Sequence, residues 1–201
     1  MKMALATTVL RMVTGATMAA HGLQKLTCLL GGGGPEAAGK TFEKLGFSSG
    51  KQFAIVTGAA ETTGGALMTL GLGTPLACSM VSGVMCGAVA RVHYKNGFWN
   101  AQRGFEYNLL ILAATFEVAA AGGGALTLDA LRRKSHRGFA WAVAQLAVGA
   151  GAAWAALALD ERQSSNELAP RWATSSDDKG PRQEVDLTGD PEARAGADPV
   201  H

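Results

Sequence analysis

Residues 53–92 read FAIVTGAAETTGGALMTLGLGTPLACSMVSGVMCGAVARV, and this stretch decides the fold. It holds two apolar runs, from Phe53 to Leu72 and from Leu76 to Val92, joined by Gly73-Thr74-Pro75. About 20 mostly apolar residues cross the roughly 30 Å hydrocarbon core of a bilayer. Glycine permits a positive φ and proline ends helices, so the short connection reverses the chain. The stretch therefore predicts an antiparallel pair of transmembrane helices.

Three further apolar runs flank this pair, from Met3 to Leu30, from Tyr107 to Leu126 and from Phe139 to Leu159. Small residues at helical spacing, such as Gly83 and Gly87, let helix backbones approach closely inside a membrane. The predicted fold is all-α, a membrane-embedded bundle of four core transmembrane helices plus a fifth. Such a chain is a multi-pass protein of the cell membrane, and its first partner is the lipid bilayer.

The mean hydropathy of +0.13 averages over two parts of the chain that differ in composition. Residues 1–159 hold thirteen Lys or Arg and six Asp or Glu residues, whereas residues 160–201 hold five and ten. The second segment has too little apolar surface to offset the entropy of ordering it, so we expect a disordered polar tail. The predicted organisation is a four-helix bundle over 1–131, a basic loop and fifth helix over 132–159, and the tail over 160–201.

The orientation in the membrane follows from two sets of basic residues that disagree. Arg132-Arg133-Lys134 and Arg137 form the densest cluster and place the fourth loop, and with it the N-terminus, in the cytoplasm. The first and third loops together hold a larger basic total on the other side. The cluster favours a cytoplasmic N-terminus and, with five helices, an external tail.

Two local motifs suggest other readings of the N-terminal region. The first run begins like a cleavable signal peptide, but Arg11 interrupts it and it continues to Leu30, beyond the length of a signal sequence. Residues 34–41, GPEAAGKT, match the phosphate-binding pattern G-x-x-x-x-G-K-[ST]. That loop requires a preceding β-strand, whereas here an apolar helix and several glycines precede it, so no nucleotide site is expected.

Other common chemistries find little support in the sequence. Cys28, Cys78 and Cys86 form no C-x-x-C pair, so burial in apolar surroundings is the expectation for all three. The basic residues lie in helix-connecting loops without interleaved aromatic residues, which is not typical of a nucleic-acid interface.

The informative residues are ionisable side chains inside or at the ends of the apolar runs, because such groups are costly in lipid and usually face a cavity or the bundle interior. His21, Glu61, His93 and Glu106 all fall on one membrane side if successive helices alternate in direction. They are the candidate catalytic residues. Gln24, Lys25 and Arg91 belong to the same end, and with His21 they are the candidate cofactor-binding residues.

Two His and two Glu side chains could also bind Zn, Fe or Mn, but the sequence shows no pattern of neighbouring residues that would orient such ligands, so no metal site is assigned. Their alternative role is structural, as hydrogen-bonding groups that fix the register between helices. Arg11 and Glu117 lie deeper, at similar depths in the first and fourth helices. We predict an interhelical ion pair between them, because each charge alone would be costly in lipid.

An ordered set of short motifs resembles the DoxX family of small bacterial membrane proteins over most of residues 8–131. The motifs are Leu10-Arg11, His21-Gly22-Leu23-Gln24-Lys25-Leu26, Phe42-Glu43-Lys44-Leu45-Gly46-Phe47, Gly58-Ala59-Ala60-Glu61-Thr62-Thr63-Gly64-Gly65, Gly71-Leu72-Gly73-Thr74-Pro75, then Met85, Ala88, His93, Asn96-Gly97-Phe98-Trp99 and Gly104-Phe105-Glu106-Tyr107. The fifth helix and the tail lie outside the family's four-helix pattern, and Glu117 is not one of its motif residues.

The resemblance implies a link to membrane redox chemistry. Relatives occur as membrane subunits of thiosulfate:quinone oxidoreductase, or as membrane partners of a soluble superoxide dismutase and a sulfurtransferase. A quinone is the candidate ligand, and soluble redox enzymes are the candidate partners. A non-catalytic scaffold for soluble enzymes is the alternative, and a small proton-linked or solute-conducting bundle is a third class. An apolar crevice that reaches His21 and Glu61 would favour the quinone reading.

Overall fold

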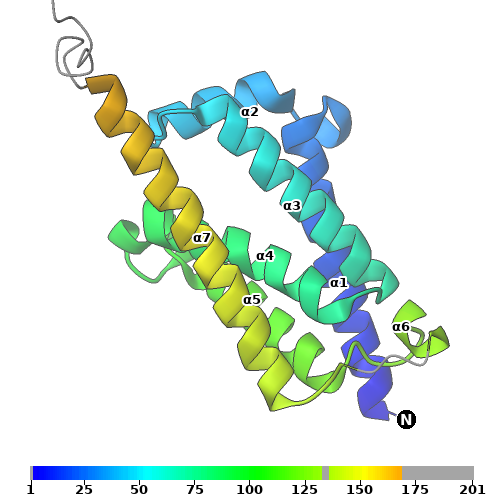
Figure 1. The fold of residues 1–201 in the computed structure, drawn as a ribbon. Coiled ribbons are helices and arrows are strands. Elements are labelled where there is room, and N and C mark those ends of the chain that lie inside the picture. Colours follow the sequence, from blue (N-terminus) through cyan, green and yellow to red (C-terminus); the bar gives the residue numbers. More distant parts are fainter. Residues whose placement is uncertain (1, 133–135, 169–201) are drawn as a thin grey trace, which may run out of the picture. The chain divides into compact units, whose positions relative to one another are not determined.

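A computed structural model describes residues 2–132 and 136–168 of the chain. No strand occurs in these residues, so the all-α prediction is confirmed. The α-helices, drawn in Figure 1, are α1 (Lys2–Leu26), α2 (Gly34–Lys44), α3 (Gly50–Leu70), α4 (Thr74–Ala88), α5 (Glu106–Ala121), α6 (Leu128–Leu131) and α7 (Phe139–Leu168). A single π-helical segment, Val89–His93, prolongs α4, and 3-10 turns follow it at Tyr94–Asn96 and Asn100–Gln102.

The hairpin between α3 and α4 has the turn that the sequence predicts. Gly71 ends α3 with a φ of 65°, and Gly73 precedes α4 with a φ of 59°. Both values lie in the left-handed region, which glycine adopts without a steric penalty. Pro75 occupies the first turn of α4, where its missing N–H leaves no helical hydrogen bond unmade.

Close contact between α1 and α3 depends on glycine. A Cβ atom added to Gly15 would lie 2.7 Å from the carbonyl oxygen of Gly65, and one added to Gly22 would collide with the backbone of Thr62. Real side chains do not fit at these separations, so small residues set the distance between the two helices. This packing brings the end of α1 that carries His21 beside the middle of α3.

The fifth predicted helix, α7, is an integral part of the bundle. Gly149 packs on α4, where an added Cβ would lie 2.6 Å from the carbonyl oxygen of Ser79. Ser82 of α4 lies 2.9 Å both from Thr115 of α5 and from the side-chain oxygen of Gln145 of α7, and all three residues are buried. The core residues come from α1, α3, α4, α5 and α7, as in Met18, Met68, Val81, Val118 and Ala142.

α7 also continues past its predicted end at Leu159 and reaches Leu168. Asp160, which the sequence placed in a disordered tail, is only 1% exposed and accepts hydrogen bonds from the backbone N–H (3.0 Å) and hydroxyl (2.6 Å) of Ser48. A buried carboxylate with these donors is part of the folded structure. The remainder of the predicted tail, residues 169–201, lies outside the described residues.

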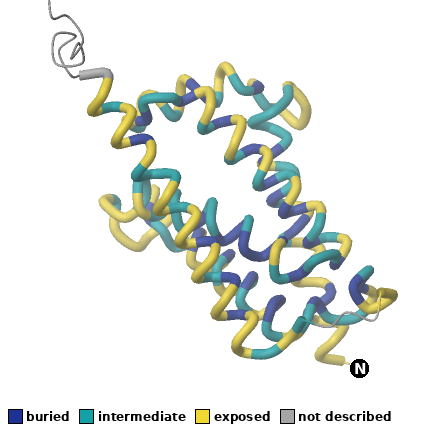
Figure 2. Tube along the Cα trace, in the orientation of Figure 1, coloured by how far each residue is buried: buried dark blue, intermediate teal, exposed yellow. Residues whose placement is uncertain are grey.

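The outer surface of the helices is apolar. Figure 2 shows exposed positions recurring along α1, α3, α5 and α7. They include large apolar side chains such as Val13, Val56, Leu110 and Trp154, each more than 60% exposed. A water-soluble protein rarely exposes so much apolar surface, whereas lipid covers it without cost.

Three of the described helices are long and apolar enough to cross a membrane by length and composition: Lys2–Leu26, Thr74–Asn96 and Phe139–Asn166. α5 has 16 residues and is therefore about 24 Å long, shorter than a typical hydrocarbon core. The chain is a membrane protein with three candidate spans. The count of four core spans plus a fifth stays a prediction.

The predicted ion pair between Arg11 and Glu117 is wrong. The Arg11 guanidinium is 1% exposed and donates to the backbone carbonyls of Gly123 (2.8 Å), Met68 (2.7 Å), Thr69 (2.5 Å) and Leu126 (3.2 Å). Glu117 is exposed and forms no ion pair with a described residue. Arg11 therefore caps the end of α3 and binds the turn after α5, where carbonyls lack helical partners.

A second charged group supports the same end of the bundle. The Asp129 carboxylate of α6 accepts hydrogen bonds from the backbone N–H groups of Gly73 (2.9 Å) and Thr74 (3.0 Å) and from the Thr74 hydroxyl (3.0 Å). Burial alone raises the pKa of Asp129. The bonds from Thr74 and Gly73 and the charge of His136 outweigh it, so the pKa lies below its usual value of 3.8.

Candidate functional site

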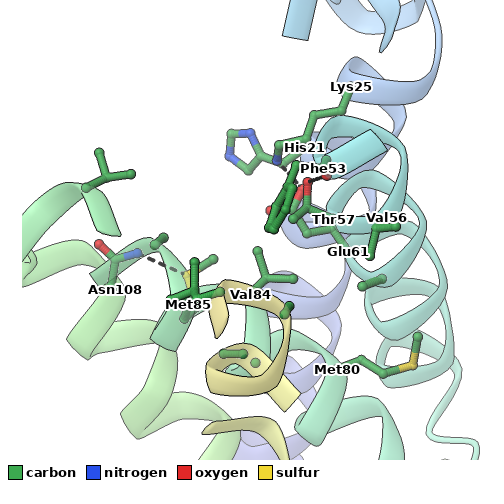
Figure 3. Close-up of a pocket in the computed structure, with 18 of the residues that line it drawn as sticks. His21, Lys25, Phe53, Val56, Thr57, Glu61, Met80, Val84, Met85 and Asn108 are labelled. Carbon is green, nitrogen blue, oxygen red and sulfur yellow. Dashed lines mark hydrogen bonds and ion pairs between the residues drawn. The ribbon is translucent and has the colours of Figure 1, made fainter. Parts of the chain in front are cut away.

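An apolar cavity of about 620 Å³ lies among α1, α3, α4, α5 and α7, beside the loop that follows α2. The space is open because many of the side chains around it are small or flexible: glycine and alanine fill little volume, and methionine adapts its shape. Those of α4 and α7 are Met80, Gly83, Met85, Gly87, Ala88, Ala152, Ala153 and Ala156. Figure 3 shows the few polar groups that reach it.

The charged part of the cavity wall is an ion pair between Lys25 of α1 and Glu61 of α3. Glu61 is 3% exposed, whereas the Lys25 side chain is 26% exposed. A carboxylate buried at this depth requires a cation or several donors. The glycine-mediated packing of α1 on α3 places the Lys25 ammonium within reach, and the pair joins the two helices at the edge of an apolar space.

His21 lies one helical turn before Lys25 and is exposed. It lines the cavity and also a neighbouring polar groove of about 370 Å³, which Lys25, Gln24, Gly31 to Gly33 and Thr41 help to form. The Gln24 amide donates to the carbonyl oxygen of Leu30 at 2.8 Å. His21 and Lys25 thus border two spaces, one apolar and one polar.

The other two predicted residues are placed differently. His93, in the π-helical segment, lines the cavity, and its Nδ1 lies 2.7 Å from the carbonyl oxygen of Arg103. Glu106, at the start of α5, accepts a hydrogen bond from the backbone N–H of Asn100 at 2.9 Å and does not line the cavity. Three of the four residues that the sequence brought together therefore border one space, and Glu106 instead closes a loop.

Arg91 does not line the cavity but supports its rim. Its guanidinium donates to the carbonyl oxygen of Gly46 at 2.8 Å, lies 3.7 Å from an Asp160 carboxylate oxygen, and sits 5.3 Å from the ring centre of Phe47. Phe47 itself lines the cavity. Arg91 and Asp160 therefore connect α4, α7 and the loop after α2 at this border. The role of Arg91 in cofactor binding stays a prediction.

In the parts of the chain that the structure describes, no three His, Cys, Asp or Glu side chains gather as a metal site would require. The apparent phosphate loop is helical: Gly34 to Lys44 form α2, with Pro35 in its first turn. A helix at these residues does not provide the loop of backbone amides that would hold a nucleotide phosphate.

Asn108 of α5 lines the cavity and was not predicted. It is 5% exposed, and its amide nitrogen lies 3.5 Å from the sulfur of Met85. The signal was present in the sequence, since Asn108 is a polar residue inside an apolar run and the cost of burial applies to amides as well as charges. The same signal marks Gln145 in α7.

Residues 6–94 match the sequence model of the DoxX family. The match supports a DoxX family assignment for this part of the chain. The DoxX segment begins within α1 and ends just after the π-helical turn, so it holds His21, Glu61 and His93 as well as the glycine-rich residues of α2. α5 and α7, with Asn108 and the alanine wall of the cavity, lie beyond it. Searches of curated proteins and of solved structures gave no match to the chain.

Proposed function

We propose that this DoxX-family protein is a quinone-binding membrane subunit of a redox complex in the cell membrane. One observation carries the proposal: an apolar cavity of about 620 Å³ reaches both His21 and the Lys25–Glu61 pair, whose carboxylate is buried. Ligand sites of 300–1,000 Å³ are typically apolar with a few polar groups that orient the ligand. The cavity has this composition, and it lies among helices with lipid-facing surfaces.

The polar groups of the cavity suit a ring that carries carbonyl oxygens. The Lys25 ammonium has three hydrogens, and its bond to Glu61 leaves others for an acceptor. The apolar walls accept a ring and the start of an isoprenoid tail without desolvating polar groups. A bound quinone would supply redox chemistry, taking up two electrons and two protons to form a quinol.

The chain's own contribution would be binding and proton supply. Glu61 holds the Lys25 ammonium at the cavity wall, and His21 borders both the cavity and the polar groove. An imidazole ring has two nitrogens, one of which can accept a proton while the other donates one, so His21 is suited to pass protons between the groove and the Lys25–Glu61 pair. The electrons would come from a soluble redox enzyme that docks at the membrane, as the relationship to DoxX proteins suggests.

The first test is equilibrium binding of a short-chain benzoquinone to the purified protein in lipid nanodiscs. Glu61→Gln leaves the Lys25 ammonium without its carboxylate partner and should weaken binding. Glu36→Gln is the matched control, because Glu36 pairs with Lys51 on the surface of α2 and α3 and lies outside the cavity lining. Equal affinity of wild type and Glu61→Gln would contradict the assignment of the Lys25–Glu61 pair as the group that binds a quinone oxygen.

Activity is tested separately in membranes that contain the whole complex, with thiosulfate as the electron donor. Wild type should support quinone reduction, and Glu61→Gln and His21→Ala should lower it while the protein remains folded. Unchanged quinone reduction in membranes lacking this chain would refute a redox role.

The alternative function is a non-catalytic membrane scaffold for soluble enzymes. The observation that favours it is that Glu61 already has a partner in Lys25, as a purely structural carboxylate would. A scaffold would bind a soluble enzyme and show no saturable quinone binding. Its partner should still co-purify with a variant whose cavity is filled.

A further inference from the structure

We infer that Asn108 is the second polar anchor of the cavity and that the ligand therefore carries hydrogen-bond acceptors at two ends of an apolar body. This inference rests on the proposed function, since it concerns the ligand of the same cavity. Asn108 comes from α5, whereas Lys25, His21 and Glu61 come from α1 and α3. Figure 3 shows the amide apart from that charged group, with Val84 and Met85 of α4 near it.

The amide of Asn108 lacks a strong partner. Among the described residues, its only hydrogen-bond partner is the Met85 thioether at 3.5 Å, a weak acceptor. An amide NH2 group has two hydrogens, and one sulfur can take only one of them. Because the side chain is 5% exposed and the cavity lining is apolar, the second hydrogen points to no protein oxygen. A ligand oxygen in the cavity would complete its bonding.

The buried hydroxyls of Ser82 and Thr115 in the same bundle do have oxygen partners. Thr115 lies seven residues after Asn108 on α5, about two turns further along the same face. Its hydroxyl lies 2.9 Å from that of Ser82 and 2.8 Å from the carbonyl oxygen of Leu112. Both hydroxyls have an oxygen partner within the protein, whereas the Asn108 amide has none among the described residues. The buried Nε2 of Gln145 also lacks a partner, but Gln145 lies outside the cavity lining, so Asn108 is the amide that a ligand in the cavity can reach.

Two separated anchors select a class of ligand. A fatty acid or an isoprenoid alcohol has one polar end, which the Lys25 end alone would satisfy. A ring with two opposed carbonyl groups can meet Lys25 with one oxygen and Asn108 with the other. Donors on two different helices of the cavity therefore favour a para-dione over single-headed lipids, because burying Asn108 beside a purely apolar ligand would leave its amide unsatisfied.

The test compares two ligands and three variants by equilibrium dialysis against protein in nanodiscs. The ligands are an alkyl-substituted para-benzoquinone and a matched ring with the same tail and a single carbonyl. Asn108→Leu removes the amide at similar volume, and Asn108→Gln keeps it. Thr7→Val is the control, because Thr7 is a buried residue of α1 outside the cavity lining and its hydroxyl donates to the carbonyl oxygen of Met3 in its own helix at 3.2 Å.

Asn108→Leu should weaken quinone binding about fivefold to tenfold, the value of one hydrogen bond. It should leave binding of the single-carbonyl ring unchanged, Asn108→Gln should recover part of the loss, and Thr7→Val should match wild type. Equal quinone affinity of Asn108→Leu and wild type would overturn the inference while the proposed function stands. Absence of quinone binding by wild type would overturn the proposed function itself.

A variant that does not fold leaves the test intact, because the ligand pair can be compared on wild type alone. The single-carbonyl ring should then bind about fivefold to tenfold more weakly than the quinone. Equal affinities would show that the second acceptor meets no donor and would refute the role of Asn108.

Discussion

Replacing Arg11 with methionine should lower the free energy of unfolding by about 3–5 kcal/mol. The Arg11 guanidinium donates to four backbone carbonyls, two of them at the end of α3 and two in the turn after α5. Hydrogen bonds to a charged group contribute about 1.5–3 kcal/mol each to stability, and burying the charge costs several kcal/mol. The difference leaves a net contribution of Arg11 to stability of about 3–5 kcal/mol, which the methionine variant loses. Methionine fills much of the volume but satisfies none of the carbonyls.

The stability of Arg11→Lys should fall between those of wild type and Arg11→Met, because a lysine keeps the charge but lacks the planar guanidinium group that donates several hydrogen bonds in fixed directions. Glu117→Gln is the matched control. Glu117 is exposed, so its loss should change stability by about 0.5 kcal/mol or less. If the two residues formed an ion pair instead, the control would lose as much stability as the Arg11 variants.

Reversible unfolding in mixed micelles, followed by circular dichroism as denaturing detergent is added, measures these differences. Wild type, Arg11→Lys and Arg11→Met should unfold at successively lower detergent fractions, and Glu117→Gln should unfold with wild type. An Arg11→Met variant within about 0.5 kcal/mol of wild type would refute the capping role, because single surface changes usually fall in that range.

Three further predictions concern other parts of the chain. Because the pKa of Asp129 is lower in the folded protein than its usual value of 3.8, the ionised carboxylate stabilises the fold above pH 3.8, and this stabilisation is lost as pH falls through the folded pKa. Asp129→Asn should therefore be less stable than wild type at pH 7 and lose less stability in acid. Unfolding midpoints of both proteins from pH 2 to 7 test this, and an equal loss of stability in acid by the two proteins would contradict it. Ser48→Ala should speed amide hydrogen exchange in residues 45–50, because it removes a bond to Asp160 of α7, whereas Ser164→Ala should not, because Ser164 bonds only within α7. Protease added outside intact cells should remove the C-terminal tail if five helices span the membrane with a cytoplasmic N-terminus; cleavage only from the cytoplasmic side would contradict that topology.

The sequence predicts the helices and the hairpin well because their signals are local. Length, apolar composition and the Gly73-Thr74-Pro75 turn each act within a few residues of the chain. α2 was missed because its residues were assigned to a loop, although Pro35 and Glu36 are typical of a first helical turn. The end of α7 was placed too early because the charge of Asp160 suggested solvent, whereas Ser48 binds it from a distant part of the chain.

The error at Arg11 has a geometric cause. Rise per residue gives the depth of a side chain along a helix axis but not the direction in which it points. Glu117 lies at a depth similar to that of Arg11, yet the buried face of α5 carries Thr115 and Val118. Backbone carbonyls at helix ends are equally good acceptors, but their positions depend on the assembled fold and no sequence pattern records them.

Alternation of helix direction correctly predicts that His21, Glu61 and His93 reach one end of the bundle, because it requires only the order of the helices. It does not predict which of them border a common space. Glu106 starts α5 but bonds to the loop at Asn100, and α7 supplies the alanine wall of the cavity from outside the DoxX segment.

The most direct test of the account is to fill the cavity and measure quinone binding in nanodiscs. Ala153 lines the cavity from α7, and the exposed Ala155 two residues later does not. Ala153→Phe should weaken binding of a short-chain benzoquinone at least about tenfold, because the added ring occupies the ligand's space, while Ala155→Phe should bind like wild type and both should unfold near the wild-type midpoint. Equal binding by folded Ala153→Phe and wild type would contradict the assignment of the cavity as the quinone site.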